Sequence, residues 1–272
     1  MGNVKQIQTQ ILKYQEKRSV IMNSLQIIEQ EKRVLRWGGL SGMLGGFLFM
    51  LVWVVVGVFV GEDPDTLEGW VARFPEIQAA RVVENLIYLV ALILEVPLFL
   101  ALYRALRRTS LAPALFGSAV GILGLVAMVV STTPHVAHAR ISAIYFAAET
   151  TPADQATIIL MWQAIWGMID MMLYIGFFVV PIGLFVLGMG MFSAPAFGKV
   201  IGGVSMVLGA AGIVAAILQM IDPASMIGAV TYFACLIFYL VVGWKLFSLS
   251  RGPSEVLESQ MVQPASMEAI SP

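Results

Sequence analysis

An acidic residue inside a long apolar stretch is the best candidate for chemistry in this sequence. Glu95 lies near the middle of residues 82–108, which are mostly apolar until a cluster of arginines at the end. An ionised side chain at that depth of a membrane costs about 2.5–3.5 kcal/mol. Glu95 therefore either binds a cation, a proton or a polar lipid head group, or forms a structural hydrogen bond to a serine or a backbone carbonyl. Pro97 leaves the carbonyl of Ile93 without its helical donor, so that carbonyl is one such partner.

Two further polar residues extend this candidate ligand site. Asn85 lies in the same apolar stretch, nearer its outer end, and caps the helix if it does not contact a ligand. Asp170 is expected near the outer boundary of the membrane. We predict Glu95, Asn85 and Asp170 as ligand-binding residues, because polar groups inside membrane bundles face a cavity or a partner.

Two histidines form a second candidate site. His135 and His138 are three residues apart, so they share one face of a helix that begins after Thr133. This spacing can ligate a metal ion, but a catalytic zinc site needs a third protein ligand. The candidates for that third ligand are Asp170, Glu149 and Asp154. Because Arg140 lies nearby and disfavours a bound cation, we expect a polar cluster on the outer face and predict neither a metal nor a cofactor.

Enzymatic chemistry has little support in the sequence. Ser131 lies four residues before His135, a spacing that suits a nucleophile and its base. No Gly-x-Ser-x-Gly motif surrounds this serine, and a helix cap explains it equally well. The sequence also lacks a His-Glu-x-x-His motif, a phosphate-binding loop and a dinucleotide fingerprint. We therefore assign no catalytic residue and lean against an enzyme.

The composition identifies the elements that must position these residues as membrane-spanning helices. Of the 272 residues, 59% are hydrophobic and 12% are charged, whereas a soluble domain carries about 25% charged residues. We predict an all-α fold, a transmembrane helical bundle of six spans that occupies residues 37–250, followed by a disordered polar tail over residues 251–272. The six predicted spans are residues 39–60, 82–108, 111–130, 171–191, 198–220 and 226–249.

The connections between the spans predict short helices on the outer face. Proline follows each of four capping residues, Asp63, Thr133, Thr151 and Asp222, and a capping residue before proline is typical of a helix start. We predict an interfacial helix that starts at Pro64 and ends at Pro75, and a second helix over residues 134–148. A third, over residues 152–191, is about 60 Å long. Since this is twice the hydrocarbon thickness, residues 152–170 are expected outside the membrane.

The basic residues predict the orientation of the bundle. Seven of the sixteen lysines and arginines precede the first span, three lie between spans two and three, and Lys199, Lys245 and Arg251 bring this side to thirteen. By the positive-inside rule this side is cytoplasmic. We therefore predict a multi-pass protein of the cell membrane with both termini in the cytoplasm. The net charge of −1 gives no indication of a nucleic-acid partner.

Residues 1–36 form a separate cytoplasmic segment with a heptad pattern. Two positions of the heptad are mostly apolar over more than four repeats, with lysine, arginine, glutamate and glutamine between them. The pattern is typical of a coiled coil, and an amphipathic helix that lies on the inner leaflet is the alternative. The residues predicted to mediate assembly are Ile7, Ile11, Tyr14, Ile21, Leu25, Ile28 and Leu35.

Two segments resemble a bacterial family of six-helix integral membrane proteins that is catalogued as a domain of unknown function. The family's second span ends in an acid, an apolar stretch, Leu-Tyr and basic residues, and Glu95, Tyr103, Arg104 and Arg107 of this sequence are similar. The turn over residues 194–198 is similar to the family's Leu-Pro-x-x-Leu-Gly turn, although it is one residue shorter and lacks both leucines. The resemblance covers residues 38–250 and implies six spans, with no activity attached.

These observations leave three functions open. We favour a non-enzymatic membrane protein that assembles through its N-terminal helix, as a homo-oligomer or as a subunit of a larger membrane complex. The alternative is a carrier or binding protein for a small or lipid-like ligand that uses Glu95 and requires a cavity reaching this residue. The least favoured function is a membrane-embedded hydrolase built on His135, His138 and Asp170.

Overall fold

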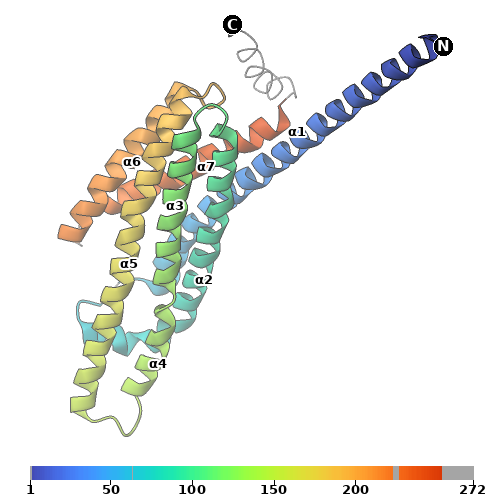
Figure 1. Ribbon diagram of the computed structural model, residues 1–272. Coiled ribbons are helices and arrows are strands. Elements are labelled where there is room, and N and C mark those ends of the chain that lie inside the picture. Colours follow the sequence, from blue (N-terminus) through green and yellow to red (C-terminus); the bar gives the residue numbers. More distant parts are fainter. Residues whose placement is uncertain (1, 63, 223–226, 253–272) are drawn as a thin grey trace.

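The computed structural model of the protein is entirely helical over the residues that it describes. These are residues 2–62, 64–222 and 227–252, with side chains from Gln26 onward apart from those of Val136 and Thr231. The described elements, in chain order, are α1 (Gly2–Val55), the π-helical turn η1 (Val56–Val60), α2 (Leu67–Leu106), α3 (Leu111–Thr132), α4 (His135–Tyr145), α5 (Pro152–Ser193), α6 (Gly198–Ile221) and α7 (Ile227–Arg251). Figure 1 shows them as an elongated bundle from which the N-terminal part of α1 projects.

Six helical segments in the described ranges are long and apolar enough to cross a membrane. They contain α1 from Gln26 onward together with η1, then α2, α3 together with α4, α5, α6 and α7. The predicted all-α class and the number of candidate spans are thereby confirmed, as expected of a multi-pass membrane protein. The predicted disordered tail falls almost entirely on residues 253–272, which lie outside the described residues.

Two of the helices are about twice as long as a membrane is thick. α2 has 40 residues and α5 has 42, so each is about 60 Å long, against about 30 Å of hydrocarbon. α5 begins where the sequence predicted, since Thr151 and Asp154 form a capping box with Pro152 in the first turn. α4 begins after Pro134, as expected, and ends at Tyr145, three residues earlier than expected.

The prediction that a separate interfacial helix ends at Pro75 was wrong. α2 runs without interruption through both Pro75 and Pro97. It begins after Thr66, whose hydroxyl oxygen accepts a hydrogen bond of 3.1 Å from the backbone amide of Gly69. The predicted cap, Asp63, lies outside the described residues. A proline inside a helix removes one hydrogen bond but does not end the helix where tertiary packing holds the flanking turns.

Packing of this kind is found in two separate hydrophobic cores. A small outer core joins the beginning of α2, α4 and the beginning of α5 through buried Val71, Phe74, Ile141, Ile158 and Trp162. Trp162 lies more than thirty residues before the end of α5, about 45 Å along the helix. A larger core fills the rest of the bundle.

The spanning helices form two groups of three. α1 packs closely with α2 and α7, and α5 packs closely with α3 and α6. Glycines allow the close approach: a Cβ at Gly183 would lie 2.6 Å from the amide nitrogen of Gly121, and a Cβ at Gly39 would lie 2.6 Å from the carbonyl oxygen of Gly243. The groups meet along α2 and α3, while α6 and α7 contact each other less.

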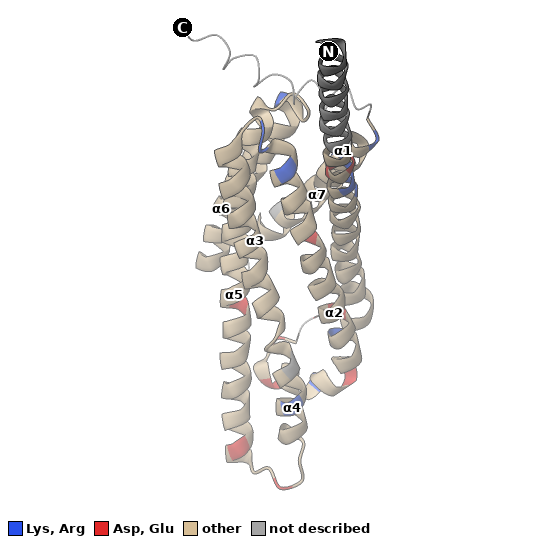
Figure 2. Cartoon of the chain, turned by 45° about the vertical axis from the view of Figure 1, so that its right-hand side comes forward, with Lys and Arg blue, Asp and Glu red and all other residues tan. Residues whose placement is uncertain are grey.

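Charged residues are distributed unevenly along the bundle. Figure 2 shows lysine and arginine gathered toward the end that contains the α2–α3 turn, and acidic residues toward the other half. This end is the one from which the N-terminal part of α1 projects (Figure 1). We call it the basic end.

Candidate functional site

Glu95 is fully buried between helices of the first group. Its side chain has no exposed surface, and neither carboxylate oxygen has a hydrogen-bond partner among the described residues. A Cβ at Gly45 of α1 would lie 2.6 Å from Oε1 of Glu95, so the space for the carboxylate exists only because that residue is glycine. An unpaired polar group without water is costly, and Glu95 therefore needs a proton, a cation or a donor from another molecule.

Within the described part of the chain, Glu95 does not form the structural hydrogen bond considered for it. The hydroxyl of Ser41 of α1 donates instead to the backbone carbonyl of Leu94, at 2.5 Å. This bond satisfies a carbonyl in the turn that Pro97 disturbs, as serine commonly does beside proline in membrane helices. Among the described residues, nothing satisfies the acid itself.

Buried tyrosines lie near the acid. The Glu95 carboxylate lies near enough to the hydroxyls of Tyr232 and Tyr239 of α7 to interact with them electrostatically. Tyr88 lies seven residues before Glu95, on the same face of α2, and its hydroxyl is also buried without a partner in the described part of the chain. Phe49 packs edge-on against Tyr88 and Tyr232, with ring centroids 5.5 and 5.9 Å apart. We call Tyr88, Glu95, Tyr232 and Tyr239 the polar cluster.

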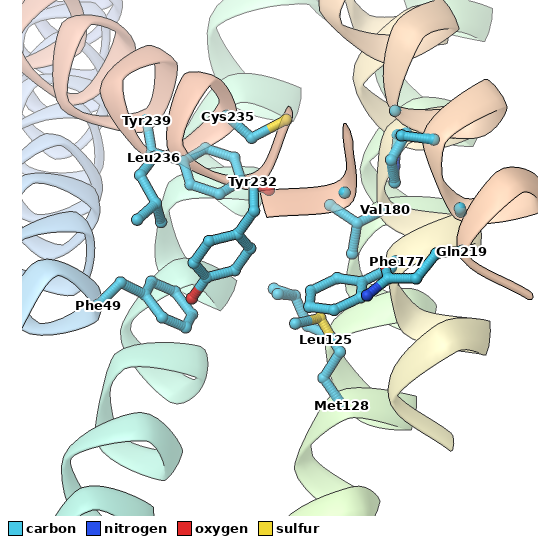
Figure 3. A pocket seen from close by; sticks show the side chains of 15 residues that line it. Phe49, Leu125, Met128, Phe177, Val180, Gln219, Tyr232, Cys235, Leu236 and Tyr239 are labelled. Atoms are coloured by element: carbon cyan, nitrogen blue, oxygen red, sulfur yellow. The ribbon is translucent and has the colours of Figure 1, made fainter. Parts of the chain in front are cut away.

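A cavity lies beside this cluster, where the two groups of helices meet. It encloses about 570 Å³ with its open mouth included. Figure 3 shows Phe49, Tyr232, Leu236 and Tyr239 on one side of it and residues of α3, α5 and α6 on the other. Most of the lining is apolar; the polar side chains are Tyr232, Tyr239, Gln219 and the thiol of Cys235. Tyr232 and Tyr239 therefore belong both to the cavity wall and to the polar cluster.

The predicted ligand residues do not all meet here. Glu95 does not itself line the cavity, and neither Asn85 nor Asp170 is among the lining residues. Asn85 is half-buried and lies ten residues from Glu95 on the same helix, about 15 Å away. Asp170 is half-buried on α5, seven residues before the lining residue Phe177.

The two histidines lie together in the outer core, far from the cavity. Their ring centroids are 5.8 Å apart, and the fully buried ring of His138 packs 4.1 Å from that of Trp162. Both imidazoles are therefore packed among aromatic rings.

This outer cluster lacks the geometry of a metal site or a hydrolase. No group of three histidine, cysteine, aspartate or glutamate side chains that could hold a metal occurs among the described residues. The Ser131 hydroxyl donates to the carbonyl of Met128 at 2.6 Å, one turn back on its own helix. Asp170 lies eight residues from Trp162 along α5, about 12 Å away. The polar cluster expected at His135 and His138 stays a prediction.

Part of the predicted assembly seam is used within the chain. Ile28 and Leu35 are 5% and 4% exposed, and Leu35 belongs to the core of the spanning bundle. Between them, Glu31 forms ion pairs with arginines at the end of α2. The side chains of Ile7, Ile11, Tyr14, Ile21 and Leu25 lie outside the described side chains.

Sequence reasoning missed the tyrosines and Gln219. Tyr232 and Tyr239 are seven residues apart in an apolar run, a pattern that resembles ordinary core packing. Gln219 ends the apolar stretch of α6 and resembles a boundary residue. The only signal for them is that each introduces a polar atom into a predicted span, where polar atoms need partners.

Comparisons with known proteins add no assignment to this geometry. No family model, curated protein or solved structure matches the chain. The resemblance to the six-helix family, which rests on residues near Glu95 and the turn after α5, stays a prediction.

Proposed function

We propose that this multi-pass membrane protein binds an amphipathic, lipid-like ligand in the cavity between its two groups of helices. The observation that carries the proposal is the fully buried Glu95, which has no hydrogen-bond partner among the described residues and interacts electrostatically with Tyr232 and Tyr239 of the cavity wall. Mostly apolar walls with a few polar groups suit a small-molecule site. The ligand's apolar part packs against the walls, and its polar end carries hydrogen-bond donors that face the polar cluster.

The charge of Glu95 sets the chemical class of the polar end. A carboxylate accepts hydrogen bonds, and charge-assisted hydrogen bonds to it are about twice as strong as neutral ones. A ligand with a primary amine gains more from Glu95 than one with a hydroxyl, and a fatty acid gains least because it carries the same charge. The proposed order of affinity is therefore amine, alcohol, carboxylic acid.

The orientation of the bundle follows from its charges. With the basic end in the cytoplasm, as the positive-inside rule requires, both termini are cytoplasmic and the cavity lies in the outer half of the membrane. Its lining residues on α6 and α7, such as Ala216 and Tyr232, lie near the ends of these helices that are remote from Lys199 and Lys245. Ligands would enter from the outer leaflet.

Filling the cavity is expected to abolish binding. Ala216 lines the cavity and is 2% exposed, so Ala216→Phe places a ring in the ligand's space. Val214, two residues away on the same helix, is 55% exposed, so Val214→Phe adds a ring to the lipid-facing surface. With a fluorescent long-chain primary amine as the probe, we expect at least a ten-fold loss of affinity for Ala216→Phe and none for Val214→Phe.

The full-length protein in detergent serves for this measurement, with the thermal midpoint of each variant as a test of folding. Equal affinities for the two folded variants would exclude the cavity as the binding site. If Ala216→Phe does not fold, Gln219→Leu replaces it, because this change alters the polarity of the cavity wall at similar volume.

Assembly through the N-terminal helix is a second candidate function. α1 is a continuous helix of 54 residues whose first part projects from the bundle (Figure 1), and a lone helix in water gains most of its stability from packing an apolar face. Because Ile28 and Leu35 are buried in their own chain, the seam available to a second copy lies before residue 28.

Removing residues 2–24 is expected to convert an oligomer to a monomer. Native mass measurement of the full-length and shortened proteins in the same detergent gives the number of copies in each. Replacing Ile11 and Leu25 together by aspartate tests the heptad without shortening the chain, since two charges within the apolar seam oppose pairing. A full-length protein that is already monomeric would disprove assembly through this helix and leave the ligand proposal unaffected.

A further inference from the structure

Three arginines converge on one buried carboxylate at the basic end of the bundle. The Glu31 side chain of α1 is 6% exposed, and its Oε1 lies 2.7 Å from Arg104, 2.8 Å from Arg108 and 3.6 Å from Arg107, in each case from an Nη2 atom. Arg104 belongs to the last turn of α2, and the other two arginines follow directly in the turn to α3. We call these four residues the arginine cluster.

The cluster carries more positive than negative charge. One carboxylate neutralises one of the three guanidinium groups, so two positive charges remain close together. The neighbouring acid, Glu29, is engaged elsewhere, with Arg33 at 2.8 Å. In addition, Nε of Arg107 is buried and has no hydrogen-bond partner among the described residues. Guanidinium groups have no means of losing their charge in a protein, so the cluster needs a second anion.

The position of the cluster indicates where that anion comes from. The arginine side chains are 26–32% exposed, so they are accessible while Glu31 beneath them is not. Lipid-facing apolar residues lie one turn away on either helix, Leu100 of α2 at 51% exposed and Leu111 of α3 at 57% exposed. Trp37 of α1, which is 70% exposed, suits the head-group level of a membrane. The guanidinium groups therefore lie where an apolar surface meets the head groups.

We propose that Arg104, Arg107 and Arg108 form a binding site for the phosphate group of an anionic membrane lipid. Arginine pairs of this kind bind phosphate oxygens through two parallel hydrogen bonds, and basic pockets at this level of a membrane bind anionic head groups. Glu31 is a positioning residue that holds the three side chains in one place. The lipid's acyl chains then cover the apolar surface around Leu100 and Leu111.

Binding of phosphatidylglycerol to the full-length protein in detergent tests this site. Native mass measurement with short-chain phosphatidylglycerol is compared with phosphatidylcholine of the same acyl chains, and we expect at least ten-fold tighter binding of the anionic lipid. Arg107→Gln should reduce this preference at least five-fold. The matched control is Arg33→Gln, which removes the same charge from an exposed ion pair on α1 and should leave the preference unchanged.

Each other result overturns the proposal. Equal binding of the two lipids would show that the arginine cluster does not select anionic lipid. An equal loss of the preference in Arg33→Gln and Arg107→Gln would show that only the overall charge of the basic end attracts the lipid. If inorganic phosphate at the same concentration as the lipid displaces the lipid completely, the site binds a free anion and not a lipid. If Arg107→Gln does not fold, Arg107→Lys keeps the charge but not the paired hydrogen bonds and should still weaken binding. Because the measurement uses micelles, it does not depend on the proposed orientation, on the cavity or on assembly.

Discussion

Glu95→Gln is expected to weaken binding of a long-chain primary amine about 10–100-fold. The change keeps the size of the side chain and removes only its charge. A hydrogen bond to a charged group contributes about 1.5–3 kcal/mol, and 1.4 kcal/mol corresponds to a factor of ten in affinity. The alcohol of the same chain length carries no charge of its own, so its affinity should fall by a smaller factor than that of the amine when the carboxylate becomes an amide. The measured quantity is the ratio of the two dissociation constants.

Glu76→Gln is the matched control for this measurement. Glu76 is exposed in the outer part of α2, on the same helix as Glu95, so its removal changes the net charge equally without touching the cavity. If the ratio of amine to alcohol affinity changes equally in Glu76→Gln and Glu95→Gln, the effect is a long-range effect of charge. Glu95 would then not belong to the binding site.

The stability of a leucine variant separates a functional from a structural role for Glu95. The carboxylate has no partner among the described residues, so replacing it by an apolar side chain should raise the thermal midpoint of the ligand-free protein. Functional residues commonly lower stability in this way. A lower midpoint for Glu95→Leu, by contrast, would mean that the acid holds α1, α2 and α7 together.

The spans and the acid could be predicted because each depends on local sequence alone. Lipid requires about twenty apolar residues in a helix, and such runs stand out, as does a single charge within one of them. The boundary at Pro75 could not be predicted in the same way. Whether a proline ends a helix or only interrupts its hydrogen bonds depends on the partners of the flanking turns, and here Val71 and Phe74 pack against Trp162, almost ninety residues later.

The cavity and the polar cluster could not be predicted, because they depend on how distant helices meet. Tyr232 is 137 residues after Glu95 in the sequence, and only the packing of α7 against α1 and α2 brings the two together. The same holds for Glu31 and the arginines. The heptad pattern gave Ile28 and Leu35 a role in pairing with a second chain, whereas the structure buries both side chains within the chain and places Glu31 against the end of α2.

Two adjacent glycines of α6 should respond oppositely to alanine. A Cβ at Gly202 would lie 2.3 Å from the backbone nitrogen of Phe192 and 2.9 Å from the carbonyl oxygen of Gly188, both on α5. Backbone atoms cannot rotate away, so Gly202→Ala must push the two helices apart. Forcing an extra group into a packed site costs about 1–3 kcal/mol. A Cβ at Gly203 meets no atom within 4 Å, so Gly203→Ala should be neutral or slightly stabilising, since alanine favours the helix.

Thermal unfolding in detergent and amine binding together show what the α5–α6 contact does. α6 supplies Ala216 and Gln219 to the cavity, and α5 supplies Phe177 and Val180. Separating the helices at Gly202 should therefore widen the cavity and weaken binding as well as lower the midpoint, whereas Gly203→Ala should preserve both. Unchanged binding in a destabilised Gly202→Ala variant would mean that the α6 side of the cavity does not contact the ligand. Contacts of the ligand's polar end with α2 and α7 would then account for binding without the α6 side of the cavity.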